Sequence, residues 1–184
     1  MAGRGLIETL DGAGFAATEH ARAAGSVVCP VLQGTRCLLV EVQALTATGF
    51  LGSAKRKTSG LDASRLAMLI AVLEKRGGLR LADQDVFASS VGGLKVAEPA
   101  ADLATALAIA GAHYDRDLGP GVCAVGEIGL SGEIRRVQRL ELRLREAGRL
   151  GFTKIIGPPG SDGVPDGCEL IGVERLGAAL ELLG

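Results

Sequence analysis

Side chains that could act as nucleophiles, bases or metal ligands are few in this chain of 184 residues. The two histidines, His20 and His113, have no ligand partner at helical spacing, so we expect solvated side chains and no metal site. The four cysteines form no CxxC pair, and the sequence predicts buried or half-buried thiols in a reducing cytoplasm. These cysteines are Cys29, Cys37, Cys123 and Cys168.

A loop that could bind nucleotide phosphates is also missing from the sequence. A P-loop needs a glycine-rich turn ending in Gly-Lys-Ser/Thr, because its backbone N–H groups must surround the phosphates. The nearest string, Gly52 to Lys55, is too short and has the wrong order. We therefore expect that this chain alone does not hydrolyse ATP.

Basic residues supply the strongest remaining signal for function. Phosphate contacts need cations that converge on one surface. The candidates are Lys55, Arg56, Lys57, Arg65, Arg135, Arg136, Arg139 and Arg143. Strand alternation would send Arg135 and Arg136 to opposite faces. A Glu141–Arg145 pair at i, i+4 is what any solvated helix shows, so plain solvation is the competing interpretation of these charges.

Composition limits the classes of function that remain. Apolar residues make up 47% and charged residues 22%, which is typical of a soluble globular protein. The net charge of −1 means that any contact with nucleic acid must come from a local basic patch. Aromatic residues reach only 3%, which offers few stacking platforms for unpaired bases. No secretory signal is visible, and no stretch approaches the ~18 apolar residues of a membrane span.

The order of the predicted elements favours an α+β fold over a doubly wound sheet, because strands and helices mix without strict alternation. The clearest helix begins at Asp62, a capping residue, and carries the apolar stripe Leu66, Leu69, Ile70 and Leu73. Residues 46–60 are predicted to form a flexible basic loop. Helices are predicted over residues 62–76, 99–110, 138–149 and 174–183, and strands over 26–32, 36–45, 85–91, 122–128, 133–137, 154–156 and 169–171.

Four stretches closely resemble the C-terminal Lon protease-like domain of the bacterial RadA (Sms) family of DNA repair and recombination proteins. They are residues 38–45, 65–76, 98–104 and 126–137, and the resemblance is dense over about residues 26–158. It implies a Lon proteolytic-domain fold, similar to domain 2 of ribosomal protein S5, with a mixed sheet and packed helices. Residues 26–184 would form this domain, and residues 1–25 would be a flexible tether from the junction with an absent ATPase core.

The resemblance also implies that the catalytic dyad of the Lon proteases has been lost. That family uses a serine in a Pro-Ser-Ala-Gly string and a lysine base in a Gly-Gly-Leu-Lys string. The matching positions here are Ala100 and Glu141, so the domain is expected to be a pseudo-protease and not an enzyme. Ser89, Ser90, Ser131 and Lys95 match no dyad position. An unrecognised nucleophile at Ser131 or Ser90 is therefore the least favoured reading.

What the RadA family does follows from the resemblance alone. Its members consist of a four-cysteine zinc module, a RecA-like ATPase and this domain, so ATP, Mg²⁺ and Zn²⁺ would belong to the absent parts. The family implies cytoplasmic hexameric rings that drive branch migration in DNA recombination and repair of DNA damage. Its Lon-like domain would support the ring and bind duplex or branched DNA, without a membrane partner. The alternative is a purely structural oligomerisation module with no DNA contact. The sequence leaves open whether the chain is an excised domain or a natural short protein.

Overall fold

The computed structural model describes residues 23–50, 52–160 and 163–184. The predicted tether over residues 1–25 therefore falls almost entirely outside the described residues, as does His20. The described residues form a seven-stranded mixed sheet, a separate two-stranded sheet and four α-helices. The predicted α+β class is confirmed.

The large sheet has the strand order β3-β4-β2-β1-β5-β8-β9. Its strands are β1 (Ser26–Gln33), β2 (Arg36–Thr48), β3 (Arg56–Ser59), β4 (Gln84–Ser90), β5 (Val122–Ala124), β8 (Lys154–Gly157) and β9 (Glu169–Gly172). The predicted hairpin between the first two strands is confirmed, because β1 and β2 pair antiparallel in a register that closes at Gln33 and Arg36. Strand β4 is antiparallel to β2, whereas β3 is parallel to β4, and β1, β5, β8 and β9 pair parallel in turn.

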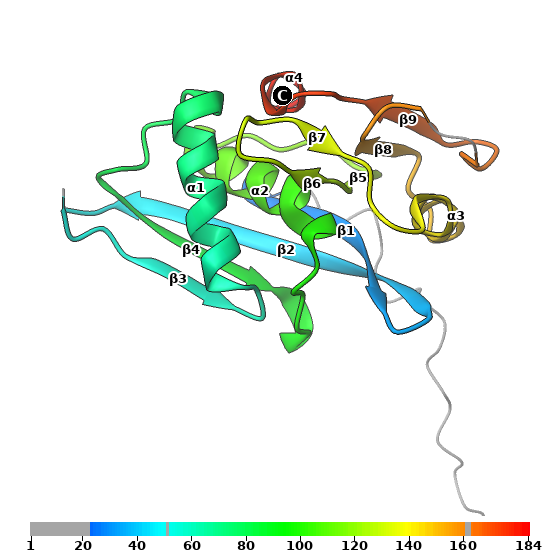
Figure 1. Ribbon diagram of the computed structural model, residues 1–184, viewed down its shortest axis with the longest axis horizontal. Coiled ribbons are helices and arrows are strands. Elements are labelled where there is room, and N and C mark those ends of the chain that lie inside the picture. The colour runs from blue at the N-terminus through cyan, green and yellow to red at the C-terminus, as the bar shows by residue number, and fades with distance from the viewer. Residues whose placement is uncertain (1–22, 51, 161–162) are drawn as a thin grey trace, which may run out of the picture.

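The helices lie on both sides of this sheet (Figure 1). They are α1 (Ala63–Gly77), α2 (Asp102–Tyr114), α3 (Leu140–Arg149) and α4 (Leu176–Leu180), with 3-10 turns η3 (Val91–Gly93) and η4 (Pro99–Ala101). Helix α1 begins as predicted, because the Asp62 carboxylate accepts the Arg65 backbone N–H at 2.8 Å. It ends at Gly78, whose left-handed backbone lets its N–H reach the Leu73 carbonyl.

Two apolar clusters hold the layers together. The larger one packs α1, α2 and α4 against one face of the sheet and includes Leu73, Leu107 and Val86. Helix α2 is buried at every residue from Asp102 to Gly111, and its alanines allow the close approach that this requires. The smaller cluster packs Leu144 and Ala147 of α3 against the other face, beside Phe152 and Val28. Strands β1, β5 and β8 thus contribute side chains to both clusters, whereas β4 contributes only to the larger one.

Several predicted boundaries were wrong, and long-range pairing explains the largest error. Residues 46–60 are not simply a loop, because β2 runs on to Thr48 and residues 56–59 form β3. That strand exists because β4, far along the chain, supplies its hydrogen-bond partners. The predicted strand over 122–128 is divided between β5 and β6 (Glu127–Ile128), and β6 pairs with β7 (Ile134–Arg135) in the small sheet. The last helix is shorter than the predicted 174–183.

Candidate functional site

The two positions matched to the Lon dyad do not line a common cleft. Ala100 lies in η4, where it is buried and its carbonyl accepts the Gly126 N–H at 2.9 Å. It lines an open cleft of about 760 Å³ together with Glu98, Pro99, Glu127, Arg136, Val137, Gln138 and Arg143. Glu141 lies on the exposed side of α3 and lines a different groove. The cleft beside Ala100 is lined by no serine or lysine from the described residues.

Arg143 occupies the floor of this cleft as an internal ion pair. Its side chain is only 1% exposed, and its guanidinium binds both carboxylate oxygens of Glu98 at 2.7 and 2.8 Å. It also donates to the carbonyls of Pro30 and Gln138 at 2.7 and 3.0 Å. The guanidinium therefore fastens α3 to β1 and to the start of η4. This placement corrects the sequence prediction, because a buried and paired Arg143 cannot reach a phosphate.

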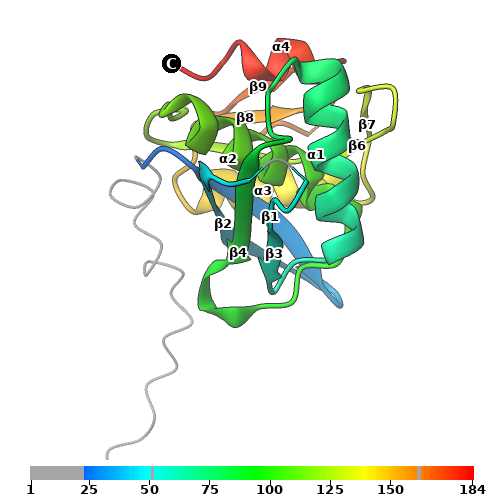
Figure 2. The same cartoon turned by 90° about the vertical axis from the view of Figure 1, so that its left-hand side faces the viewer.

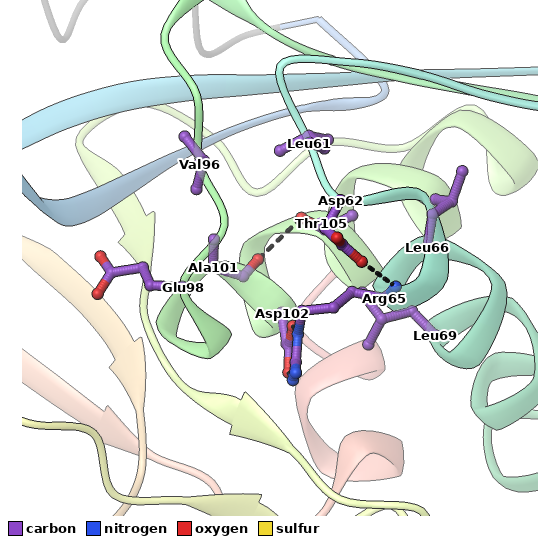
Figure 3. A pocket seen from close by; sticks show the side chains of 10 residues that line it. All are labelled: Leu61, Asp62, Arg65, Leu66, Leu69, Val96, Glu98, Ala101, Asp102 and Thr105. Atoms are coloured by element: carbon purple, nitrogen blue, oxygen red, sulfur yellow. Dashed lines mark hydrogen bonds and ion pairs between the residues drawn. The ribbon is translucent and has the colours of Figure 1, made fainter.

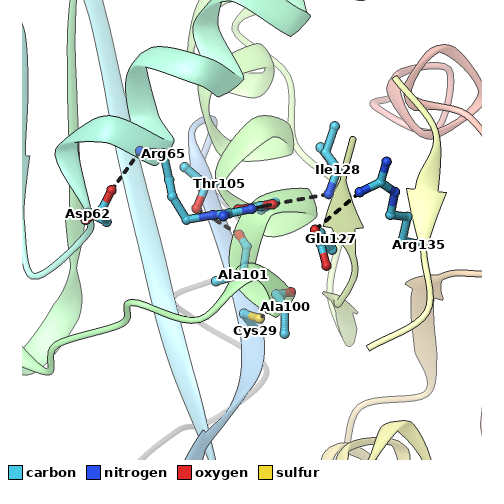
Figure 4. A network of polar contacts seen from close by, with 10 residues as sticks. Cys29, Asp62, Arg65, Ala100, Ala101, Thr105, Glu127, Ile128 and Arg135 are labelled. Atoms are coloured by element: carbon cyan, nitrogen blue, oxygen red, sulfur yellow. Dashed lines mark hydrogen bonds and ion pairs between the residues drawn. The ribbon is translucent and has the colours of Figure 1, made fainter. Parts of the chain in front are cut away.

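Arg65 is committed to a second internal carboxylate (Figures 3 and 4). Its guanidinium forms a bidentate pair with Asp102, with Nε 2.8 Å from Oδ1, and the Asp102 side chain is only 3% exposed. The same carboxylate accepts the Ile128 backbone N–H at 3.2 Å. Burial raises the pKa of Asp102, and the hydrogen bonds from Arg65 and Ile128 offset part of that rise. Arg65 and Asp102 thus link α1, α2 and β6, and the Arg65 guanidinium is already hydrogen-bonded within the fold.

Arg135 is held among acidic neighbours on the small sheet. It contacts Glu133, just before β7, and lies 3.7 Å from a Glu127 carboxylate oxygen on β6. The hydroxyl of Ser131 donates to Glu133 as well, and these bonds lower the pKa of the Glu133 carboxyl to about 2. Arg136 follows β7 and lines the cleft beside Ala100, which Glu127 also lines. Strand alternation does not act on both arginines, because β7 ends at Arg135.

Three arginines at the start of α3 remain without a carboxylate partner within the described part of the chain. Arg136, Arg139 and Arg145 line one open groove of about 700 Å³, next to Glu141. Arg136 donates to the Gly160 carbonyl at 3.3 Å. Arg145 forms no ion pair with Glu141, so the i, i+4 pair expected from the sequence is wrong. Helical spacing predicts that Arg145 lies on the exposed face of α3. Because a pair with Glu141 was expected, Arg145 was not among the predicted DNA-binding residues.

The basic run of residues 55–57 lies elsewhere in the molecule. Arg56 and Lys57 belong to β3 at one edge of the large sheet and Lys55 directly precedes it, whereas α3 packs against β1 and β2 (Figure 1). Lys55 and Lys57 are exposed. The Arg56 guanidinium instead donates to the carbonyls of Leu81, at 2.8 Å, and Gln84. The predicted basic residues therefore do not form one continuous surface.

The other chemically reactive side chains are engaged within the fold. Ser90 is buried and its hydroxyl donates to the Leu94 carbonyl. His113 is half-buried, with Nδ1 3.1 Å from the Gln84 amide oxygen, and is not the solvated side chain that we expected. Three cysteine thiols are buried and Cys168 is half-buried, as predicted. Burial raises the pKa of Cys37 to about 11 and also raises that of Cys123.

The described residues contain no group of three or more His, Cys, Asp and Glu side chains that could hold a metal ion. Within the same residues, no helix is both long enough and apolar enough to cross a membrane.

The described residues form an α+β domain built on a mixed seven-stranded sheet. No family model matches the chain. It is 46% identical to the DNA repair protein RadA of Streptococcus pneumoniae, over 98% of this chain and 44% of that protein. It is 43% identical to the DNA repair protein RadA of Bacillus subtilis, over 98% of this chain and 40% of that protein. The chain is therefore homologous to part of RadA, as expected of the C-terminal domain of that family. It spans about two fifths of the length of these curated relatives.

Proposed function

We propose that this chain is a non-catalytic domain of a RadA-type DNA repair and recombination protein that binds duplex or branched DNA through the α3 groove. The α3 groove is the surface lined by Arg136, Arg139 and Arg145. One observation carries this proposal: three arginines converge on one surface, and none has a carboxylate partner in the described part of the chain. Phosphate contacts require that arrangement. The names of the relatives supply DNA as the class of partner.

The backbone of Arg139 gives this groove independent support. Its φ of 51° and ψ of 41° place it in the left-handed region, at the residue that precedes α3. A side chain in that region costs about 1 kcal/mol relative to glycine. An arginine retained in a strained conformation suggests that its side chain is needed there for something other than stability. A phosphate contact in the groove is such a need.

The absence of catalysis rests on the chemistry of the cleft beside Ala100. A methyl group at that position cannot attack a carbonyl, and Glu141 lines the neighbouring groove instead. The buried cation of the cleft, Arg143, is paired with Glu98 and keeps its protons, so it cannot act as a base. Labelling of the native protein with a fluorophosphonate tests this claim. We expect no labelled serine, and a labelled Ser131 or Ser90 would contradict the proposal.

The proposal extends to the assembly and to the parts of RadA outside this chain. We propose that the domain supports a hexameric ring in the cytoplasm, and that ATP, Mg²⁺ and Zn²⁺ act in other parts of the whole protein. An apolar groove between the β1–β2 hairpin and α3 favours a second candidate function, a purely structural oligomerisation module. That groove is lined by Cys37, Leu38, Leu39, Leu94, Leu142 and Leu150 beside Thr35, Arg36, Glu146 and Arg149. Rings in light scattering without any DNA binding would favour this second function.

Fluorescence anisotropy with a labelled duplex and a four-way junction tests the DNA contact directly. We expect the logarithm of affinity to fall with the logarithm of salt concentration by about 0.9 for each phosphate neutralised. Replacement of Arg136, Arg139 and Arg145 by glutamate should abolish most of that dependence. The matched control reverses three exposed cations elsewhere, Lys75, Arg80 and Arg116, and gives the same net charge. Equal loss in both variants would show general electrostatics and would overturn the assignment of the α3 groove.

A further inference from the structure

One face of the sheet carries no helix over β3, β4 and the second half of β2, whereas α3 packs against the first half of β2. On the opposite face, Val86 and Ala88 of β4 pack into the core formed with α1 and α2. Strand alternation turns the intervening Phe87 outward. On this outer face Leu45 of β2 is 61% exposed and Phe87 is half-buried. Figure 2 shows α1 and α2 on the one side of these three strands.

The strand register aligns the outward side chains into two rows. Lys57, Phe87 and Leu45 are direct partners across β3, β4 and β2 and form an apolar row with a cation at its edge. Ser59, Ser89 and Gln43 are partners in the same way and form a polar row beside it. These six side chains line one open groove of about 620 Å³, which we call the sheet groove.

The side chains of the sheet groove are available for a ligand. The hydroxyls of Ser59 and Ser89 form no hydrogen bond within the described residues. The amide nitrogen of Gln43 donates to the buried Glu41 carboxylate at 2.8 Å, which fixes the amide in place. Lys57 is exposed at the edge strand, and Lys55 stands exposed two residues before it. The Asp85 carboxylate already accepts the Lys55 backbone N–H at 2.7 Å.

We propose that the sheet groove binds unpaired nucleotides of DNA, with a base stacked on the Phe87 ring and Leu45. Every base has a flat π-face that an outward aromatic ring on a sheet can bind. The polar row would meet the edge of the base, and Lys57 with Lys55 would meet the phosphates. This inference rests on the proposed DNA-binding function, and adds a second site for a different form of DNA.

The composition of the groove favours a nucleotide over a protein partner. A stable interface between two proteins usually needs more than about 1,000 Å² of buried surface with an apolar centre. Here only two large apolar side chains, Phe87 and Leu45, lie outward, and serine, glutamine and lysine surround them. An aromatic ring, hydrogen-bonding groups and an edge cation correspond to the base, its polar edge and the phosphate of a nucleotide.

Binding of a labelled oligothymidylate of about 16 nucleotides, measured by anisotropy, tests the proposal. Phe87→Leu keeps an apolar side chain but removes the π-face, and we expect about tenfold weaker binding. Phe87→Tyr should restore the wild-type affinity. The matched control is Phe50→Leu, because Phe50 is 82% exposed and does not line the sheet groove. Lys57→Gln should weaken binding about threefold and flatten its dependence on salt.

The outcomes separate this proposal from the function on which it rests. Phe87→Leu should leave duplex binding unchanged, whereas the α3 groove variant should lose duplex binding. Duplex binding that persists while Phe87→Leu and Phe50→Leu bind the oligonucleotide equally well would overturn the sheet groove alone. A wild-type chain that binds neither probe would overturn both proposals. Loss of a dimer in light scattering with Phe87→Leu would assign the groove to a second copy of the chain and overturn the nucleotide.

Discussion

Arg143 and Arg145 are separated by one residue on helix α3, yet they lie in opposite environments. Arg143 points into the fold and makes four hydrogen bonds to Glu98, Pro30 and Gln138. Arg145 points outward into the α3 groove with Arg136 and Arg139. The helix therefore has an inner arginine that fastens the fold and outer arginines that can meet a phosphate. Basic residues are therefore available for binding only where the fold leaves them without a carboxylate partner.

The inner arginine should have the largest effect on stability. Arg143→Met leaves the Glu98 carboxylate, which also accepts the Leu32 N–H, without its cation. Removal of one partner of a buried ion pair costs about 3–5 kcal/mol, and we expect the free energy of unfolding in urea to fall by that amount. Arg145→Met on the outer side is the control and should change it by less than about 0.5 kcal/mol. Similar losses in both variants would remove the distinction between inner and outer arginines.

The second inner arginine should show a smaller loss that depends on pH. Arg65→Met removes the partner of the buried Asp102, and we expect a loss of about 2 kcal/mol at neutral pH, because Arg65 is partly exposed. Burial already raises the pKa of Asp102 in the folded state, and the loss of Arg65 should raise it further. The stability contributed by such a group is lost as the pH rises from the unfolded pKa through the folded pKa. The variant should therefore approach the wild type as the pH falls, in urea titrations at several pH values. Asp102→Asn combined with Arg65→Met should lose this pH dependence, and a deficit of the single variant that does not change with pH would contradict the role of Asp102.

A variant of Arg139, whose backbone is strained, should change stability and DNA binding in opposite directions. Arg139→Gly relieves the left-handed backbone, so we expect a gain of about 0.5–1 kcal/mol in the free energy of unfolding. The same variant should bind duplex DNA more weakly, because one cation of the α3 groove is gone. The matched control is Arg145→Gly, which should lower the free energy of unfolding by about 1 kcal/mol because glycine within a helix is destabilising. Arg139→Gly with unchanged affinity would show that this arginine is not a DNA contact.

The smallest expected effect is a difference in the salt dependence of DNA binding between variants of Arg135, in β7, and Arg136, directly after it. Arg136→Gln removes a cation of the α3 groove and should reduce the salt slope of duplex binding by about 0.9. Arg135→Gln removes a cation that Glu133 and Glu127 already hold, and the slope should change by less than about half of that. Equal changes would place both side chains on the DNA.

The local parts of the fold could be predicted from the sequence. Helix α1 carries its own start at Asp62 and its own end at Gly78, and its apolar stripe repeats within a few residues. The β1–β2 hairpin is similarly local. Strand β3 was missed because a four-residue strand has little pattern of its own, and β4 supplies its partners from 28–30 residues away.

The sequence predicted that basic residues form the candidate site, but it did not predict which of them lie together. Arg136 and Arg139 were both among the predicted residues, but the structure and not the sequence places them beside one groove. Arg143 was included wrongly, since its partner Glu98 lies 45 residues earlier in the chain. Arg65 was included although its partner Asp102 lies 37 residues later. The sequence shows how many basic residues are present, whereas the folded structure shows which of them form ion pairs with a carboxylate.

The α+β class and the relationship to RadA could be inferred from the sequence, which also predicts that Ala100 and Glu141 stand where the Lon proteases have their dyad. Those features depend on residue identity and on short-range periodicity, which are written along the chain. The tertiary structure alone decided that Arg143 and Arg65 are internal and that Phe87 lies outward between Lys57 and Leu45. The physical reason is that ion pairing and strand register join residues far apart in sequence, so the exposure of a side chain is a property of the whole fold.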